Sequence, residues 1–291
     1  MSFWQLSTSD DIRLDSDCTF AYIHAHSCTF QDESMSATLL LKQRHALIQQ
    51  QLQADGRVLA LDLARQLDVS EDTIRRDLRE MAAAGLCQRV YGGALPLAPD
   101  AGSTLSQRKQ EAPERKARLA QAAVSLVRAG QVLFLDAGST NLAIASALPE
   151  LALTVITNAP SIAMLLMERP EIELIMAGGR VDRRAGASLG PQALRTVERM
   201  HPDLCFLGAC GADAEAGVTA FNYDEAEFKR SIAGASKAVV VAVTSDKLGT
   251  AAPFGVLATG LLQHLVLEAD ADAAHAAAFE RQGVQVLRAR A

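Results

Sequence analysis

A run of small and hydroxyl residues directly follows four apolar residues near the middle of the chain. The apolar residues 132–135 read Val-Leu-Phe-Leu, and the run after them is Asp136-Ala137-Gly138-Ser139-Thr140-Asn141. Glycine lets a backbone approach a ligand closely, hydroxyls add hydrogen-bond donors, and the helix expected from Leu142 favours an anion at its N-terminus. The run therefore predicts a phosphate cradle, with a capped strand-to-helix turn as the alternative. It is not a nucleotide P-loop, because no Gly-Lys-Ser/Thr follows it.

Two later loops hold residues that could serve the same anion. Gly178, Gly179 and Arg180 could supply backbone N–H groups and a cation. Lys247, in the loop that begins at Thr244, could meet a phosphate or a carboxylate. Ligands of parallel α/β sheets bind beyond the carboxyl ends of the strands, so the three loops are expected to meet. A plain glycine turn and an exposed lysine are the alternatives for these two loops.

A different chemistry is indicated between residues 70 and 85. Ser70 is a suitable N-cap for a helix, and Gly85 is a suitable end. The apolar residues at helical spacing are Ile74, Leu78 and Met81. The arginines that fall off this stripe are Arg75, Arg76 and Arg79. Such arginines can contact phosphates and base edges in a DNA major groove, although a surface helix with solvated arginines has the same pattern.

The neighbouring segments predict a winged helix-turn-helix domain over residues 39–97. The expected helices run from Leu39 to Asp55, over 61–67 and from Ser70 to Gly85, with a short strand at 57–59. The residues expected to be buried in the first two helices are Leu41, Ile48, Leu52, Leu61, Ala64 and Leu67. Segments 86–91 and 94–96 flank Gly92-Gly93 and predict a β-hairpin wing. Arg89 on this wing could reach a phosphate or the adjacent minor groove.

The rest of the chain predicts a linker followed by an α/β domain. Residues 98–113 lack a hydrophobic period and are expected to be an exposed linker. Solvated charge is the favoured role for Arg108, with a contact to nearby DNA as the alternative. From 114 to 291 apolar strands alternate with helices, as in an α/β fold with a parallel sheet. The expected helices cover 114–129, 162–167, 192–200, 225–235 and 272–281. The expected strands cover 132–135, 154–157, 172–176, 204–207, 239–243, 264–267 and 284–287.

Composition sets broad limits on the class of protein. The 291 residues and the formal net charge of −6 fit two globular domains with local, not general, basic surface. No run is long and apolar enough to span a bilayer, and the five cysteines lack paired spacing, so a reduced cytoplasmic location is expected. Residues 1–38 are expected to be an extension, either a disordered tail or sequence upstream of a true start at Met35. No cofactor is predicted. A metal site at His24, His26 and Cys28 is not predicted either, because these residues lack partners at zinc spacing.

The N-terminal motifs resemble the DNA-binding domain of DeoR-type bacterial transcriptional regulators. The matching residues are Arg44, Ile48, Leu52, Ser70-x-x-Thr73-Ile74-Arg75-Arg76-Asp77-Leu78 and Arg89-Val90-Tyr91-Gly92-Gly93-Ala94. In this family a His is more usual at the position of Tyr91. The resemblance implies a double-stranded DNA operator as partner. The residues that would contact DNA are Ser70, Thr73, Arg75, Arg76, Arg79 and Arg89.

The second domain resembles the DeoR sensor domain, which is similar in fold to sugar-phosphate isomerases and coenzyme A transferases. The matching motifs cover 135–140, 157–158, 177–179, 208–211, 225–230 and 245–247. The resemblance implies an effector pocket for a phosphorylated, sugar-like molecule. The residues carried over to that pocket are Asp136, Gly138, Ser139, Thr140, Lys229 and Lys247. Thr244 stands where the family commonly has Asp, and Asn141 where a third hydroxyl residue is common, so the chain departs from the family at this site.

Two functions from different classes follow. The favoured one is a homo-oligomeric transcriptional repressor that releases its operator when a phosphorylated sugar or related metabolite binds. The alternative is a sugar-phosphate isomerase-like enzyme that carries a DNA-binding appendage. Isomerisation needs a poised base, for which Asp136, Glu225 or Glu227 could be proposed. The sequence shows no local acid–lysine motif of the isomerase kind, so a sensor without catalytic residues is favoured.

Overall fold

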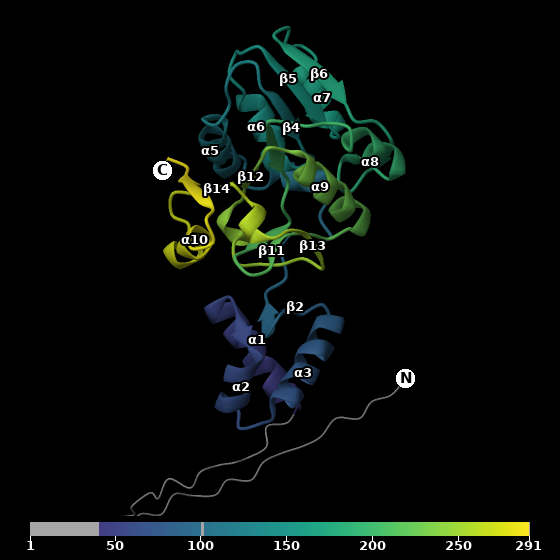
Figure 1. Ribbon diagram of the computed structural model, residues 1–291. Helices are drawn as coiled ribbons and strands as arrows, with labels where there is room; N and C mark the ends of the chain where they lie inside the picture. Colours follow the sequence, from purple (N-terminus) through teal and green to yellow (C-terminus); the bar gives the residue numbers. More distant parts are fainter. Residues whose placement is uncertain (1–40, 100–101, 291) are drawn as a thin grey trace, which may run out of the picture. The chain divides into compact units, whose positions relative to one another are not determined.

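The computed structural model describes residues 41–99 and 102–290 (Figure 1). The expectations for residues 1–38, including a true start at Met35, lie outside the described residues. None of the helices in the described ranges is long and apolar enough to cross a membrane.

The first part of the described chain is a winged helix-turn-helix. Its helices are α1 (Leu41–Asp55), α2 (Ala60–Gln66) and α3 (Glu71–Ala83), and its strands are β1 (Val58–Leu59), β2 (Gln88–Val90) and β3 (Gly93–Leu95). The strands form an antiparallel sheet in the order β1-β3-β2. Gly92 turns the hairpin with φ of 79°, a conformation that glycine adopts at little steric cost. The predicted wing is therefore confirmed.

The sequence correctly predicted the ends and the buried face of α3. The Ser70 hydroxyl accepts a hydrogen bond from the Thr73 amide at 3.1 Å, and Gly85 takes a positive φ after the last turn. Ile74, Leu78 and Met81 are all buried, as expected.

The buried faces predicted for α1 and α2 were partly wrong. Leu41 and Leu61 are 45% and 48% exposed, and Leu67 is only half-buried. The positions facing the core are Arg44, Ile48, Leu52, Ala60, Leu63 and Ala64. One reason is that Arg44 occupies a core-facing position on α1.

Arg44 forms a buried ion pair with Asp77 of α3. Nε donates to one carboxylate oxygen at 2.5 Å and Nη2 to the other at 2.9 Å. Arg44 is 8% exposed and Asp77 is 1% exposed. Two parallel N–H···O bonds fix both distance and angle, so this pair sets how α3 lies against α1.

The second part is built on a parallel sheet of seven strands, flanked by helices (Figure 1). The strands are β4 (Val132–Leu135), β5 (Leu153–Thr157), β6 (Ile172–Met176), β9 (Leu204–Leu207), β12 (Ala238–Ala242), β14 (His264–Leu267) and β15 (Gln285–Arg288). Their order is β15-β14-β12-β9-β4-β5-β6, and each neighbouring pair is parallel. All seven predicted strands are confirmed to within about one residue at each end.

The strand order reverses between β4 and β9. From β4 the chain moves outward through β5 and β6, then returns to β9 and moves outward the other way through β12, β14 and β15. Where two such halves meet, the loops beyond the carboxyl ends diverge and leave a crevice in which α/β proteins bind ligands. In this chain, these loops begin at Asp136 and at Gly208.

The helices of this part include α4 (Leu105–Gln110), which the sequence did not predict. The others are α5 (Pro113–Val124), α6 (Ser139–Ala147), α7 (Pro160–Leu166), α8 (Pro191–Val197), α9 (Tyr223–Ala235) and α10 (Ala273–Glu280). Helix α4 lies within residues 98–113, which were expected to be irregular. It is short, but Thr104 and Gln107 form a capping box and Leu105 is buried. Helix α6 begins at Ser139, three residues before the expected start at Leu142.

Short antiparallel strands were also missed. They are β7 (Arg180–Asp182), β8 (Ala187–Leu189), β10 (Gly211–Asp213), β11 (Gly217–Ala220) and β13 (Phe254–Leu257). Strands β7 and β8 form a hairpin, and β10, β11 and β13 form a small sheet. Runs of three or four residues rich in Gly and Ala carry little periodic signal, so sequence reasoning had little basis for them.

Candidate functional site

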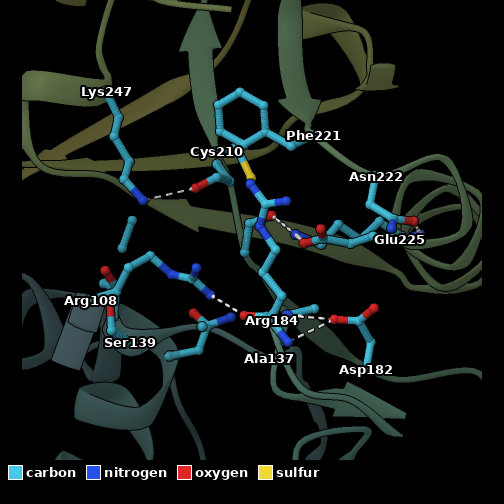
Figure 2. Close-up of a pocket in the computed structure, with 18 residues that line it drawn as sticks. Arg108, Ala137, Ser139, Asp182, Arg184, Cys210, Phe221, Asn222, Glu225 and Lys247 are labelled. Atoms are coloured by element: carbon cyan, nitrogen blue, oxygen red, sulfur yellow. Dashed lines mark hydrogen bonds and ion pairs between the residues drawn. The ribbon is translucent and has the colours of Figure 1, made fainter. Parts of the chain in front are cut away.

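A pocket lies at the reversal point of the sheet, beyond the ends of β4 and β9 (Figure 2). Its volume is about 120 Å³. It is lined by Arg108, Ala137, Gly138, Ser139, Thr140, Asn141, Asp182, Arg184, Ala185, Gly208, Ala209, Cys210, Phe221, Asn222, Glu225, Lys229, Ala242 and Lys247. The structure thus brings together the predicted loop 138–141, Lys229 and Lys247. Asp136, which was also expected there, is 1% exposed and is not among the lining residues.

The first turn of α6 presents backbone donors to this pocket. Gly138 is the N-cap and makes no side-chain capping bond, and the first intrahelical amide is that of Leu142, which donates to the Gly138 carbonyl at 2.9 Å. The amides of 139–141 therefore have no partner within the helix. A Cβ added at Gly138 would meet nothing within 4 Å, so this glycine leaves space where a ligand can reach those amides.

Asn141 has a structural role that its sequence position did not suggest. Its side-chain amide donates to the Asp136 carbonyl at 2.9 Å and to the Phe206 carbonyl at 2.8 Å. It therefore joins the ends of β4 and β9, and its two N–H donors are both used. A serine or threonine hydroxyl has one proton and could not make both bonds. The donor that Asn141 can still offer to an anion is its backbone amide.

Lys229 is held by three acceptors at the base of the pocket. Its Nζ lies 2.7 Å from a Glu225 carboxylate oxygen, 2.6 Å from the Gly208 carbonyl and 3.3 Å from Asp136 Oδ2. Burial by itself lowers the pKa of Lys229, but the carboxylates of Asp136 and Glu225 outweigh it and raise the pKa. The ammonium therefore stays charged and directs its donors at the protein. Lys229 fixes Glu225 and the loop at Gly208, even though its stem lines the pocket.

The same cluster explains why residue 208 is glycine. A Cβ there would lie 2.6 Å from the Ala137 carbonyl oxygen and 3.0 Å from an Asp136 carboxylate oxygen. The Gly208 amide donates to that carboxylate at 2.9 Å. Burial raises the pKa of Asp136, and this amide and Lys229 oppose the rise. The acid–lysine cluster that is not visible as a local sequence motif is therefore assembled in space, with its charges paired internally.

Three cationic side chains reach the pocket from outside the β4 loop. Lys247, in the short helical turn Ser245–Lys247, is half-buried and donates to the Ala209 carbonyl at 3.3 Å. Arg184 comes from the turn between β7 and β8, and Arg108 comes from α4. In Figure 2 the Lys247 side chain points toward the space beside Arg108 and Ser139. Sequence reasoning treated Arg108 as solvated and did not consider Arg184, because neither α4 nor the β7–β8 hairpin was anticipated.

The structure does not place Gly178 and Gly179 in the pocket lining. A Cβ on Gly179 would lie 3.3 Å from the Leu189 carbonyl oxygen and 3.4 Å from the Ala193 Cβ. Gly179 therefore allows close packing where the chain enters the β7–β8 hairpin, against the start of α8. The expectation that these glycines bind the effector stays a prediction that this arrangement does not favour.

The turn that carries Lys247 is anchored by a buried carboxylate. Glu268 accepts a hydrogen bond from the Ser245 amide at 2.6 Å and two from the Arg115 guanidinium, each at 2.5 Å. Burial raises the pKa of Glu268, but Arg115 and the Ser245 amide outweigh it and hold the pKa at about 2. These bonds join α5, the end of β14 and the Lys247 turn.

Replacing Glu268 by Gln is expected to reduce the free energy of unfolding at pH 7 by about 1.5–3 kcal/mol, the range for hydrogen bonds to charged groups. The pKa of Glu268 falls from its ordinary 4.5 to about 2 on folding. The wild-type stabilisation is therefore present above pH 4.5 and is lost as the pH falls toward 2. Urea unfolding followed by circular dichroism across this range measures both effects. The exposed Glu280, changed to Gln, is the control; equal behaviour of the two variants would contradict the prediction.

The predicted DNA-contacting side chains lie on exposed faces of the winged helix. Arg75, Arg76 and Arg79 are exposed on α3, and Arg89 is exposed on β2. Arg75 donates to the Glu71 carboxylate at 2.7 Å, a surface pair one helical turn apart. Ser70 and Thr73 are tied to each other at the helix start, with their hydroxyl oxygens 2.8 Å apart. The arginines are thus free of core packing, whereas Ser70 and Thr73 first serve to begin the helix.

Metal binding finds no support in the described ranges. Within residues 41–99 and 102–290, no group of three or more His, Cys, Asp or Glu side chains could hold a metal ion.

These features define a class of protein: a winged helix-turn-helix joined in one chain to an α/β domain with a polar, cation-lined pocket. Residues 44–98 match the DeoR-like helix-turn-helix domain, and residues 111–269 match the DeoR C terminal sensor domain. The chain belongs to the DeoR family and is a DNA-binding transcriptional regulator. This membership sets aside the isomerase alternative.

Individual proteins are similar to parts of this chain. The HTH-type transcriptional regulator GlpR of Haloferax volcanii is 37% identical over 198 residues, which cover 67% of this chain and 77% of that protein. The glycerol-3-phosphate regulon repressor of Escherichia coli is 33% identical over 208 residues, covering 71% of this chain and 82% of that protein. Among solved structures, ribose 5-phosphate isomerase A of Methanocaldococcus jannaschii aligns over 46% of this chain and 54% of its own, with 21% identity and a TM-score of 0.35.

Proposed function

We propose that this regulator represses genes of carbohydrate metabolism and leaves its operator when a small phosphorylated sugar or related metabolite binds the pocket. The observation that carries the proposal is the convergence of the α6 first-turn amides and Lys247 on one cavity. Amides at a helix start and a lysine ammonium are donors suited to a phosphate group. The similarity to a glycerol-3-phosphate regulon repressor supports the same chemistry.

The lining of the pocket suits the anionic end of an effector. Lys247, Arg108 and Arg184 line it together with the first turn of α6. The effector of this proposal is therefore a phosphorylated metabolite bound by its phosphate end.

The operator of this proposal is a palindromic or repeated DNA site bound by a symmetric oligomer. Winged helix-turn-helix proteins place their second helix in the major groove, and two-fold symmetric oligomers read two half-sites. The effector acts by binding better to an arrangement that holds DNA poorly, since a ligand with equal affinity for both arrangements would shift nothing.

Two variants test the anion site. Lys247→Ala is expected to raise the effector concentration needed for operator release, because a charge-assisted hydrogen bond is lost. Gly138→Val is expected to be harsher: its side chain enters space where an added Cβ meets no protein atom, the space that the phosphate needs, and the φ of 158° at this position strains any side chain. Operator affinity without effector should be unchanged in both, because neither residue lies in the winged helix. The measurement is operator release in titrations with triose, pentose and hexose phosphates.

Matched controls are Lys109→Ala and Gly283→Val, which change an exposed lysine and an exposed glycine of positive φ outside the pocket. Both should release DNA as the wild type does. The proposal fails if the two pocket variants respond like the controls, or if uncharged sugars alone release the protein.

A further inference from the structure

Helix α4 forms part of the pocket wall although it follows the winged helix directly in sequence. Arg108 of α4 lines the pocket together with Ser139 and Lys247 (Figure 2). Helix α4 packs against α6, whose first turn supplies the pocket amides. Its far end is fixed by the buried Lys116, whose Nζ donates to the carbonyls of Arg108 and Glu111. The segment that leads from the DNA-binding domain into the sensor thus contacts the place where the effector is proposed to bind.

Helix α4 and the β7–β8 hairpin hold one another. The Leu105 amide donates to the Arg184 carbonyl at 3.1 Å, and Arg108 Nη2 lies 3.4 Å from the same oxygen. The Leu105 side chain lies over Gly186, where an added Cβ would approach Leu105 Cδ2 to 2.3 Å. Helix and hairpin therefore move together, and each presents one arginine to the pocket.

We propose that Arg108 binds the anionic group of the effector and, through α4, couples occupancy of the pocket to operator affinity. This inference rests on the proposed function. It assigns an effector contact to a residue outside the three loops that follow the strands.

The bonding of Arg108 leaves it able to take an anion. Nη1 donates to the Ser103 carbonyl at 2.7 Å, whereas the bond from Nη2 to the Arg184 carbonyl is long, at 3.4 Å. A guanidinium has further N–H donors in the same plane and suits an oxyanion bidentately. Arg184 and Lys247 line the same cavity from two other segments, so an anion there can be reached by cations from three parts of the domain.

A bound anion links α4 to the other walls of the pocket. It accepts charge-assisted hydrogen bonds from Arg108 on α4 and from the donors of the other lining segments. The contact with Arg108 exists only when α4 lies on the pocket, so the anion binds that arrangement better than any other. Differential affinity of this kind is what a ligand needs in order to shift a conformational equilibrium. Coupling between two sites in proteins is commonly about 5- to 150-fold in affinity.

The test compares the full chain with Arg108→Gln and Lys109→Gln, which remove adjacent positive charges of α4; Lys109 is exposed and does not line the pocket. The probe is inorganic phosphate, set against chloride at equal ionic strength. Amide hydrogen exchange is followed at 139–142 and at 105–110. In the wild type and in Lys109→Gln, phosphate is expected to slow exchange in both segments and to weaken operator binding about 5- to 150-fold. In Arg108→Gln, protection is expected to remain at 139–142, disappear at 105–110 and leave operator binding within about twofold of its value in chloride.

Three other results would each contradict one part of the proposal. Protection of 105–110 by phosphate in Arg108→Gln, equal to that in the wild type, overturns the role of Arg108. Protection of both segments in the wild type without any change in operator affinity overturns the coupling. Absence of protection at 139–142 in the wild type overturns the anion pocket itself and the inference with it, so failure of the proposed function is recognisable by its own signature.

Discussion

Asp77→Ala is expected to destabilise the winged helix-turn-helix by about 3–5 kcal/mol, because it leaves the Arg44 guanidinium buried without its carboxylate. Arg44 is 8% exposed and directs two N–H donors at Asp77, so water cannot readily replace the lost acceptor. Single domains have a total stability of about 5–15 kcal/mol, so this loss is a large part of it. Urea unfolding followed by circular dichroism, together with operator binding at the same temperature, measures the effect.

The matched control is Asp72→Ala, which removes an exposed acid from the first turn of the same helix. It should cost no more than about 0.3–1 kcal/mol through the helix dipole. The double variant Arg44→Met with Asp77→Leu should recover most of the loss, since an apolar replacement of a buried pair is often neutral. Equal urea midpoints for Asp77→Ala and the wild type would show that the ion pair does not hold α3 against α1.

Arg75→Ala and Arg76→Ala are each expected to weaken operator binding, and the double variant is expected to approach non-specific affinity. An arginine that reads a guanine through two hydrogen bonds contributes about 1–3 kcal/mol of discrimination at its base pair. Breaking the surface pair of Arg75 with Glu71 costs only about 0.3–0.5 kcal/mol, so that pair does not prevent DNA contact. Binding is measured on DNA from upstream of the regulator's own gene, on single-base variants of that site, and at several salt concentrations.

The dependence of the affinity loss on DNA sequence and on salt distinguishes an arginine that contacts a base from one that contacts a phosphate. Loss confined to one base pair identifies a base contact. Uniform weakening on all sequences, with a salt slope reduced by about one, identifies a phosphate contact. Arg281→Ala removes an exposed positive charge at the end of α10 and should leave binding unchanged. If both α3 variants bind as this control does, α3 is not the recognition helix.

The sequence predicted elements whose pattern is long or strongly apolar. Residues 132–135 and 204–207 read as buried strands because both faces of a parallel sheet are covered, and they form β4 and β9 without a shift of either end. The apolar stripe of α3 was equally clear. Its ion pair was not visible, because Arg44 and Asp77 are 33 positions apart and nothing in either helix alone indicates a buried charge.

The part of the site that the sequence predicted follows strands with a clear apolar pattern. The loop 138–141 and Lys247 are adjacent in sequence to strands that could be recognised, and the pocket contains them. Arg108 belongs to a six-residue helix, and Arg184 lies in the turn between two three-residue strands. Such short elements show no clear period, so the convergence of the two arginines depends on tertiary contacts. Lys229 was expected to bind the effector. Its pair with Glu225 lies one turn away on the same helix, but its contacts with Asp136 and Gly208 form only once α9 is packed on the sheet.

The position of α4 also determines where this protein can be cut and rejoined. To fuse the sensor domain to a different DNA-binding domain, one would place the junction in an irregular segment. Residues 98–113 look suitable from their sequence alone. A junction after Glu111 would remove the capping box of Thr104, the packing of Leu105 against Gly186, and Arg108 from the pocket. A junction before Ser103 would keep all of them. The shortest fragment that keeps the whole pocket for a biosensor therefore starts before α4. This start lies upstream of residue 111, the position at which the match to the sensor family begins.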